Sequence, residues 1–243
     1  MLEGIDVSHY QGVIDWRAVA GAGKRFAFIR LSDGTGFRDP RFAANWAGAK
    51  AAGLTRSAYQ FFRPTESPVA QADLMLSSMG PLQDGDLPPT LDVETLCAAP
   101  ATTCAGGASA AATADAVSVW VDRISHATGL TPILYTSPGF WSQLPSHGIE
   151  QRTIPWISHW YVGKPTVPGG WKRWAFWQYT DKGQVPGIQG PVDLDRFEGN
   201  AVTLRLLTRG GVTRAVEVGV GSTAILGAVA LGAALLVTQL GKK

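Results

Sequence analysis

The chain is poor in cysteine and histidine, and this limits the chemistry it can carry. It has 243 residues, with two cysteines and four histidines. Two cysteines are too few for a disulfide-rich scaffold or a four-cysteine zinc site. The histidines (His9, His126, His147 and His159) show no paired metal-ligand spacing, so we expect no metal site. The sequence also lacks a G-x-S-x-G nucleophile elbow and a phosphate-binding Walker loop, and we expect no cofactor.

Charge is also scarce and nearly balanced. Charged residues make up 16% of the chain, and the formal net charge is +2. A nucleic-acid binder usually carries a dense basic face, so we expect no nucleic-acid partner. With 45% hydrophobic residues the chain is neither disordered nor fibrous.

The two cysteines, Cys97 and Cys104, lie seven positions apart in a stretch rich in threonine, alanine and glycine. This spacing is not the C-x-x-C of a redox or zinc motif. A disulfide would close the loop if the protein works outside the cytoplasm, and otherwise the two residues are free thiols on a surface loop. The sequence leaves both alternatives open, because it does not define the geometry that a disulfide needs.

The two ends of the chain differ in hydropathy. The first six residues include two acids and no basic or apolar run, so they predict no cleavable signal peptide. Residues 218–240 are uncharged, and as a helix they would span about 34 Å, against a hydrocarbon core of about 30 Å. We therefore expect a membrane helix at 218–240, a linker at 208–217 and a short tail at 241–243. A buried amphipathic helix is the alternative, but the segment has no polar stripe of period 3.6.

Apolar runs bounded by Gly, Pro or Asp alternate with segments of helical periodicity. The runs predict strands at 4–7, 26–31, 57–62, 88–94, 131–136, 155–161 and 174–179. Helical spacing predicts helices at 40–52, 66–79 and 110–128. This alternation is typical of the α/β class and predicts a parallel, TIM-like (β/α) barrel over residues 1–207. Its last third should be irregular, because the later strands follow one another without long helices.

Acidic residues stand at the ends of several predicted strands. Asp6 follows Gly4 and Ile5, Asp92 and Glu94 close the segment PPTLDVE, and Asp193 lies in VDLDRF. The carboxyl ends of barrel strands meet at one face, where active sites form. Residues two apart on a strand point to the same side, so Asp92 and Glu94 should share a cavity. In that cavity one carboxyl group would keep its proton while the other stays ionised, which is what glycosidic cleavage requires. Two alternatives are that these acids cap the next helix or that they bind a divalent cation.

Aromatic residues accompany these acids. They lie in predicted strands or at their ends: Tyr59, Phe61, Tyr135, Trp156, Trp160, Trp177 and Tyr179. Aromatic faces pack against the apolar faces of sugar rings, so Tyr59, Tyr135 and Trp177 are candidate walls of a sugar groove. Taken singly, each is more readily explained as a core residue.

Eight segments in order resemble glycoside hydrolase family 25, the N-acetylmuramidases or Chalaropsis-type lysozymes. They are GIDVSHYQG, FAFIRLSDG, AGLTRSAYQFF, PPTLDVE, ILYTSPGFW, PWISHW, FWQYTDKGQVPGI and VDLDRF, between about residues 3 and 200. The resemblance implies an irregular barrel of about five β/α units with further closing strands. It also implies hydrolysis of the β-1,4 bond between N-acetylmuramic acid and N-acetylglucosamine in bacterial peptidoglycan.

The resemblance also implies roles for particular residues. Glu94 would be the general acid/base, Asp92 would stabilise the 2-acetamido group, and Asp6 and Asp193 would complete an acidic floor. Tyr59, Tyr135, Trp177 and Asp33 would bind substrate. A two-carboxylate route and a route assisted by the substrate's acetamido oxygen both fit. The chain departs from the family at Gln60, where His is usual, and at Asp33, where Glu is common, and we expect tuned activity from these two changes. A third departure is a longer segment at 96–113, which we expect on the active-site side, where it would shape the groove.

The whole chain is thus expected to be a peptidoglycan hydrolase anchored by 218–240 in a virion membrane or a bacterial envelope. A phage lysis enzyme or a wall-penetrating virion enzyme would combine these features, with other virion or envelope proteins as further partners. The alternatives are a non-catalytic glycan-binding module of a virion or envelope, and a glycosidase for another polysaccharide.

Overall fold

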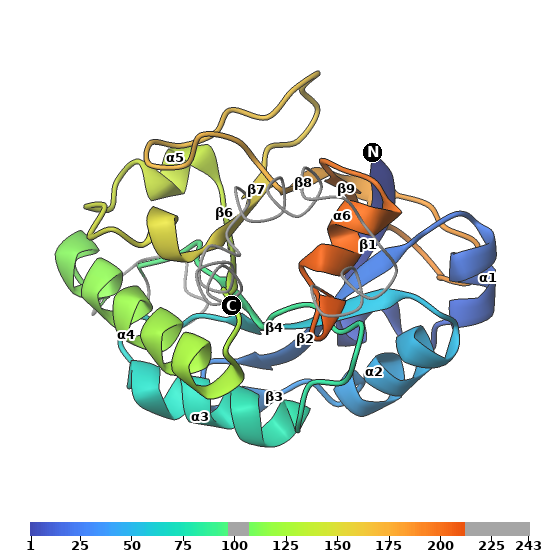
Figure 1. Cartoon of the computed structure of the whole chain (residues 1–243), viewed down its shortest axis with the longest axis horizontal. Coiled ribbons are helices and arrows are strands. Elements are labelled where there is room, and N and C mark those ends of the chain that lie inside the picture. The colour runs from blue at the N-terminus through green and yellow to red at the C-terminus, as the bar shows by residue number, and fades with distance from the viewer. Residues whose placement is uncertain (97–106, 212–243) are drawn as a thin grey trace, which may run out of the picture.

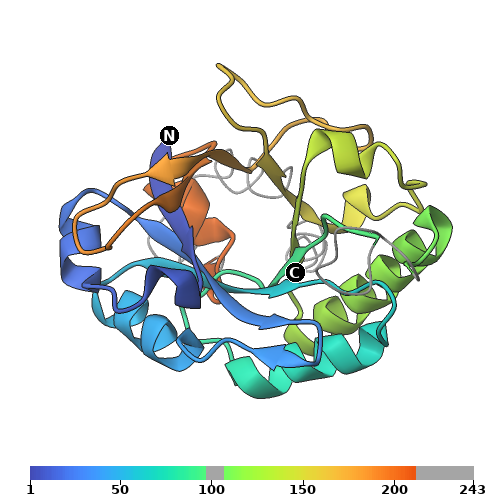
Figure 2. The ribbon, with the colours of Figure 1, turned by 180° about the vertical axis from the view of Figure 1, so that it is seen from behind.

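Eight strands close into a barrel in the computed structural model, which describes residues 1–96 and 107–211 (Figures 1 and 2). The order around the barrel is β1-β2-β4-β5-β6-β7-β8-β9, and pairing of β1 with β2 and β9 closes it. A ninth strand, β3, pairs only with β2. The strands are β1 (Leu2–Val7), β2 (Phe26–Asp33), β3 (Phe37–Arg38), β4 (Thr55–Phe61), β5 (Thr90–Asp92), β6 (Ile133–Thr136), β7 (Ile154–Ser158), β8 (Phe176–Gly183) and β9 (Val192–Phe197).

Helices follow the first five barrel strands. They are α1 (Trp16–Gly21), α2 (Phe42–Ala51), α3 (Pro68–Met79), α4 (Ala110–Thr128) and the single turn α5 (Pro138–Trp141); α6 (Ala201–Leu206) follows β9. The ribbon shows α1 to α4 around one side of the barrel, while loops join β7, β8 and β9 (Figure 1). The five β/α units and the irregular last third expected from the sequence are confirmed.

The predicted parallel barrel needs one correction, because β9 runs antiparallel to both of its neighbours, β8 and β1. Only residues 184–191 join β8 to β9. A parallel return would need a crossover of a dozen or more residues, so this short connection forces the chain to reverse.

Side chains that alternate along the strands separate two cores. Outward residues such as Val93 pack against the helices, where α4 contributes Trp120 and Ile124. The inner core is aromatic: Phe28 stacks on Trp156 with ring centroids 3.8 Å apart. Gly4 is required beside this core, because a Cβ there would lie 2.3 Å from the ring of Phe26.

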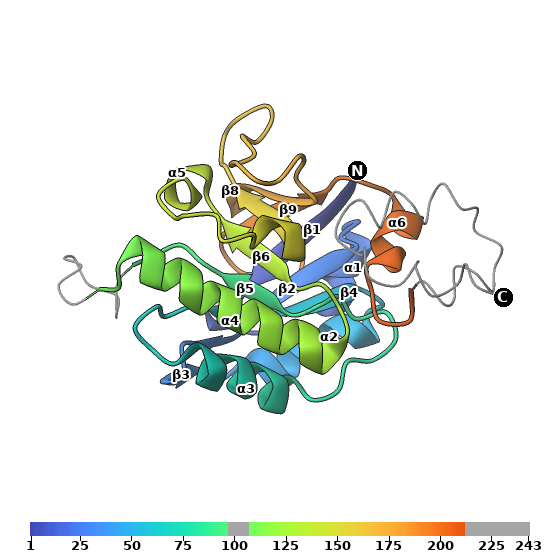
Figure 3. The same ribbon diagram turned by 60° about the vertical axis from the view of Figure 1, so that its left-hand side comes forward.

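The two ends of the barrel differ. Leu204 and Leu207, in and just after α6, belong to the inner core together with Leu87, which precedes β5. Helix α6 therefore covers the end where the strands begin, and it lies away from α5 in the side view (Figure 3). The opposite end, where the strands finish, is open to solvent and holds the pocket described below.

Two sequence expectations lie outside the described residues. These are the membrane helix at 218–240 with its 241–243 tail, and the pair Cys97 and Cys104. Among the residues that are described, no helix has both the length and the apolar character to cross a bilayer. Residues 208–211, the described part of the predicted linker, lie against the barrel: Thr208 is buried, and the backbone N–H of Arg209 donates to the carbonyl of Asp86 at 2.8 Å.

Candidate active site

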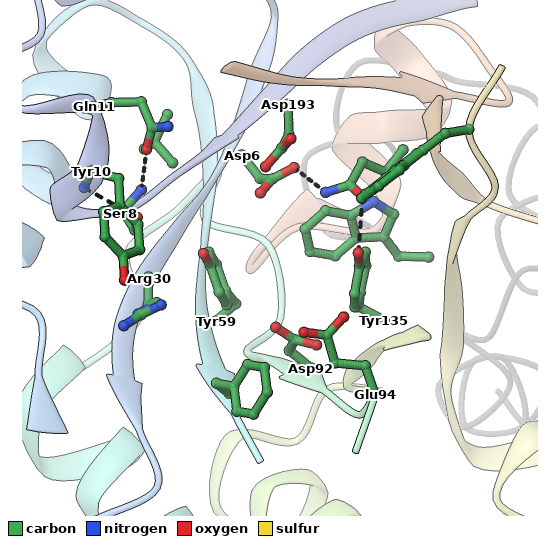
Figure 4. Close-up of a pocket in the computed structure, with 15 residues that line it drawn as sticks. Asp6, Ser8, Tyr10, Gln11, Arg30, Tyr59, Asp92, Glu94, Tyr135 and Asp193 are labelled. Carbon is green, nitrogen blue, oxygen red and sulfur yellow. Dashed lines mark hydrogen bonds between the residues drawn. The ribbon is translucent and has the colours of Figure 1, made fainter. Parts of the chain in front are cut away.

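A pocket of about 290 Å³ opens at the carboxyl ends of the strands (Figure 4). Every barrel strand contributes to its lining: Asp6, Val7, Ser8, Tyr10, Gln11, Arg30, Tyr59, Phe61, Asp92, Glu94, Tyr135, Trp156, Trp160, Gln178 and Asp193. Polar and aromatic side chains dominate this set. Such a cavity suits a ligand that has both hydroxyl groups and apolar ring faces.

All four acids predicted as catalytic line this pocket. Asp6 on β1 is the cross-strand partner of Asp193 on β9. Asp92 is the last residue of β5, and Glu94 follows it by two residues. Val93, between them, is fully buried in the outer core, as the D-x-E spacing predicts. Figure 4 shows Asp92 and Glu94 across the pocket from Asp6 and Asp193.

The first pair of acids, Asp6 and Asp193, binds protons more tightly than isolated aspartates do. Burial raises the pKa of Asp6 well above its usual range, and the charges of Asp193 and Asp195 raise it further. Burial also raises the pKa of Asp193, to about 6, although its hydrogen bond with Asp6 opposes the rise. Neighbouring carboxyl groups do not ionise independently, so this pair holds a shared proton as the pH approaches neutrality.

The second pair of acids, Asp92 and Glu94, is perturbed in the same direction. Burial raises the pKa of Asp92 well above its usual range, the charge of Glu94 adds to this, and Arg30 opposes it. Glu94 keeps an exposed surface at the pocket mouth, yet the protein atoms around its carboxyl group raise its pKa. Each ionised member makes ionisation of the other harder, so the pair also retains a proton.

Asp92 has an oxygen that the described residues leave free. Its Oδ1 is buried and has no hydrogen-bond partner among them. An unpaired buried carboxylate oxygen is unfavourable, because it loses water without gaining a donor. The oxygen is therefore positioned to accept a hydrogen bond from a ligand in the pocket.

Gln178 on β8 connects three walls of the pocket. Its Nε2 donates to Oδ2 of Asp6 at 2.7 Å. Its Oε1 accepts from the hydroxyl of Tyr135 at 2.9 Å and from Nε1 of Trp160 at 2.8 Å. These two donors fix the orientation of the amide, so that its NH₂ group must face Asp6.

Trp156 forms the aromatic floor of the pocket. Its Nε1 donates to Oδ1 of the fully buried Asp195 at 2.8 Å. The ring of Tyr135 lies 4.5 Å from that of Trp156 between centroids, and that of Tyr59 lies at 6.3 Å. Tyr59 and Tyr135, both predicted as groove residues, line the pocket and are held by this floor.

The structure places two predicted substrate-binding residues elsewhere. Trp177 is buried in a cluster with Trp174 and Ile157 outside the barrel, and its Nε1 donates to the carbonyl of His159 at 2.8 Å. Asp33 is ion-paired with Arg63, at 2.5 and 2.6 Å. Neither Trp177 nor Asp33 lines the pocket, although the charge of Asp33 raises the pKa of Asp92.

Gln60, where the family usually has histidine, also lies outside the pocket lining. Its Nε2 donates to the Ser32 hydroxyl at 2.8 Å, and its Oε1 accepts from Nε1 of Trp120 at 2.9 Å. The residue therefore joins β2 and β4 to α4, and its contacts are structural.

Nine residues of the pocket lining are not among the site residues predicted from the sequence: Val7, Ser8, Tyr10, Gln11, Arg30, Phe61, Trp156, Trp160 and Gln178. A signal for Gln178 was present, since it lies between two aromatic residues on one strand. Alternation along the strand places either those aromatics or Gln178 inside the barrel, and in the structure it is Gln178 that faces the pocket. Within the described ranges, no group of three His, Cys, Asp or Glu side chains could hold a metal ion.

Comparison with known proteins decides the family. The sequence matches the family model described as glycosyl hydrolases family 25 over residues 5–188. The chain belongs to glycosyl hydrolase family 25. It is 37% identical to Lysozyme M1 of Streptomyces globisporus over 85% of this chain and 71% of that protein. It is 32% identical to the N,O-diacetylmuramidase of Chalaropsis sp over 79% of this chain and 96% of that protein.

Solved structures agree with this family assignment. A bacterial lysozyme from Streptomyces coelicolor matches with a TM-score of 0.81 and 36% identity, covering 86% of this chain and 98% of that one. A family 25 glycosyl hydrolase from Bacillus anthracis matches with a TM-score of 0.76 and 27% identity, covering 86% and 94%. This family 25 member is therefore a glycoside hydrolase.

Proposed function

We propose that this family 25 enzyme is an N-acetylmuramidase, which cleaves the β-1,4 bond between N-acetylmuramic acid and N-acetylglucosamine in peptidoglycan. The observation that carries the proposal is the pairing of Glu94, at the pocket mouth, with the buried and unpartnered Oδ1 of Asp92. Two relatives named as a lysozyme and a muramidase support the choice of substrate.

In this proposal Glu94 is the proton donor. Its raised pKa lets it keep a proton at a pH where an ordinary glutamate is ionised. It protonates the glycosidic oxygen as the bond to the anomeric carbon breaks, and the leaving sugar departs as an alcohol. The carboxylate left behind then takes a proton from the water molecule that completes hydrolysis, which restores the acid.

Asp92 is proposed to bind the 2-acetamido group of the substrate. Its free Oδ1 accepts the acetamido N–H, and this favours attack of the acetamido oxygen on the anomeric carbon. Before substrate binds, the buried Asp92 competes with Glu94 for their shared proton. A hydrogen bond donated to the Asp92 carboxylate stabilises its ionised form, so substrate binding moves the proton towards Glu94.

The decisive experiment is mass spectrometry of peptidoglycan digested by the full chain. Muropeptides with N-acetylmuramic acid at the new reducing end are expected. Glu94→Gln should lower the rate by about 10²- to 10⁴-fold, the usual contribution of general acid catalysis. Glu198→Gln is the matched control, because Glu198 pairs with Arg173 outside the pocket and should leave the rate unchanged.

Other outcomes would replace the proposal. Equal and negligible release by the wild type and Glu94→Gln, together with binding to the glycan, would indicate a non-catalytic module. Cleavage of chitin without cleavage of peptidoglycan would indicate a glycosidase for another polymer. N-acetylglucosamine at the new reducing end would show that the other glycosidic bond is the target.

For location, the proposal is that residues 218–240 hold the enzyme on a lipid bilayer, in a virion membrane or a bacterial envelope, as a phage lysis or wall-penetrating enzyme would require. Support comes from 23 consecutive uncharged residues followed by two lysines. The full chain should float with liposomes in a density gradient. A variant with Val229→Arg and Leu235→Arg should stay at the bottom, and equal distribution of the two proteins would refute the anchor.

A further inference from the structure

Four aromatic side chains of the described residues are exposed, and each lines the pocket or lies next to a residue that does. They are Tyr10, Phe37, Trp160 and Tyr161, with 76%, 37%, 40% and 63% of their surface exposed. The other large exposed apolar residues in the described ranges are Met1 and four valines. Exposed rings confined to one face of a protein mark a binding surface rather than core packing.

The first pair of rings, which we term the β2-side platform, consists of Tyr10 and Phe37. The ring of His9 lies between them, with centroids 4.1 Å from Tyr10 and 5.3 Å from Phe37. The guanidinium of Arg30 lies 5.8 and 5.2 Å from the same two rings. The buried Asp39 accepts hydrogen bonds from the backbone N–H and Nδ1 of His9, so this platform is anchored before any ligand binds.

The second pair, the β7-side platform, consists of Trp160 and Tyr161. The hydrogen bond to Gln178 holds the indole of Trp160. The hydroxyl of Tyr161 donates to Asp181, and the backbone of Tyr161 has φ +59°, which is uncommon for a residue other than glycine. Tyr161 is thus held exposed in a conformation that costs energy, which is typical of a functional position.

Barrel topology places β2, which pairs with the strand that carries Phe37, opposite β7, which precedes Trp160 and Tyr161. In the closed order, three strands separate β2 from β7 in either direction. The same holds for β5, which carries Asp92, and β9, which carries Asp193. A ligand that reaches from one platform to the other therefore passes between Asp92 and Glu94 on one side of the pocket and Asp6 and Asp193 on the other. In Figure 4, Tyr10 and Arg30 lie to one side of the acids, and Tyr135 on β6, the strand next to β7, lies to the other.

We infer that a glycan strand lies across the pocket from the β2-side platform to the β7-side platform, with a sugar ring stacked on each. Tyr10 and Trp160 line the pocket, whereas Phe37 and Tyr161 lie beyond its lining and mark additional sugar positions on both sides of the acids. The inference rests on the proposed function and extends it. The enzyme binds an oligosaccharide through both ends of its groove, and Phe37 and Tyr161 set the chain length that it prefers.

The test compares a short and a long glycan, prepared as alternating oligosaccharides from peptidoglycan freed of its peptides. Phe37→Ala and Tyr161→Ala should each lower kcat/KM for an octasaccharide about threefold to tenfold more than for a tetrasaccharide, because each removes one stacking surface. In the double variant the two factors should multiply, since the sites are far apart. Val119→Ala, an exposed residue of α4, is the control and should show no dependence on chain length.

Binding is measured separately from catalysis. In a Glu94→Gln background, Phe37→Ala and Tyr161→Ala should weaken the affinity for the octasaccharide by similar factors. Equal loss on both chain lengths, or no loss in affinity, would overturn the inference while leaving muramidase activity intact. If the wild type cleaves neither oligosaccharide nor peptidoglycan, the proposed function itself fails.

Discussion

Replacing Asp193 with asparagine should make the protein more stable at neutral pH. Burial raises the pKa of this aspartate from its usual 3.8 to about 6 in the folded protein. That difference corresponds to about 3 kcal/mol between the folded and unfolded states. Because Asp193 shares its proton with Asp6 and faces solvent on one side, we expect a gain of about 1–2 kcal/mol at pH 7.5.

The sign of this effect depends on pH. A group whose pKa is raised by folding binds protons more tightly in the native state, so its contribution to stability is complete below pH 3.8. It is lost as the pH rises through about 6. The amide of Asp193→Asn does not titrate. The gain over the wild type should therefore be present above about pH 6 and absent below about pH 3.8.

Urea unfolding of the wild type and Asp193→Asn at pH 3.5 and pH 7.5 measures this difference. Asp115→Asn is a suitable control, because Asp115 is exposed on α4 and pairs with His147 away from the pocket. The reasoning is refuted if Asp193→Asn is less stable than the wild type at pH 7.5. It is also refuted if the two proteins differ by the same amount at both pH values.

Three further predictions concern the pocket. The charge of Asp193 raises the pKa of Glu94, so Asp193→Asn should move the basic limb of the profile of kcat/KM against pH to lower pH. A basic limb at the same pH in both proteins would contradict this. Gln178→Leu removes three hydrogen bonds, so it should lower the free energy of unfolding by about 2–4 kcal/mol and lower kcat/KM at least about tenfold. An unchanged urea midpoint would show that Gln178 does not connect the pocket walls. Trp177→Phe should lower the free energy of unfolding by about 1 kcal/mol and change kcat/KM by less than about twofold, whereas Tyr135→Phe should lower kcat/KM by a larger factor. A larger loss of kcat/KM in Trp177→Phe than in Tyr135→Phe would indicate that Trp177 binds substrate.

Local pattern was enough to predict several elements. Helix α4 spans Ala110–Thr128, as its apolar spacing predicts, with Ser109 as the N-cap and Gly129 ending it in the left-handed conformation. Both signals act within a few residues, so they can be read without the tertiary structure. The D-x-E motif was equally informative, since alternation along β5 alone puts Asp92 and Glu94 on one side and Val93 on the other.

The order of the β/α units and the acids at the strand ends can therefore be predicted from the sequence alone, because both follow from patterns of two to four residues. It did not determine which face of β8 looks inward. Trp177 and Gln178 are neighbours that point to opposite faces, and only the pairing of β8 with β7 and β9 places Gln178 on Asp6 and Trp177 outside. A shift of one residue in the pairing of β8 would exchange its two faces. Closure of the barrel excludes this shift, and that closure depends on segments far apart in the sequence.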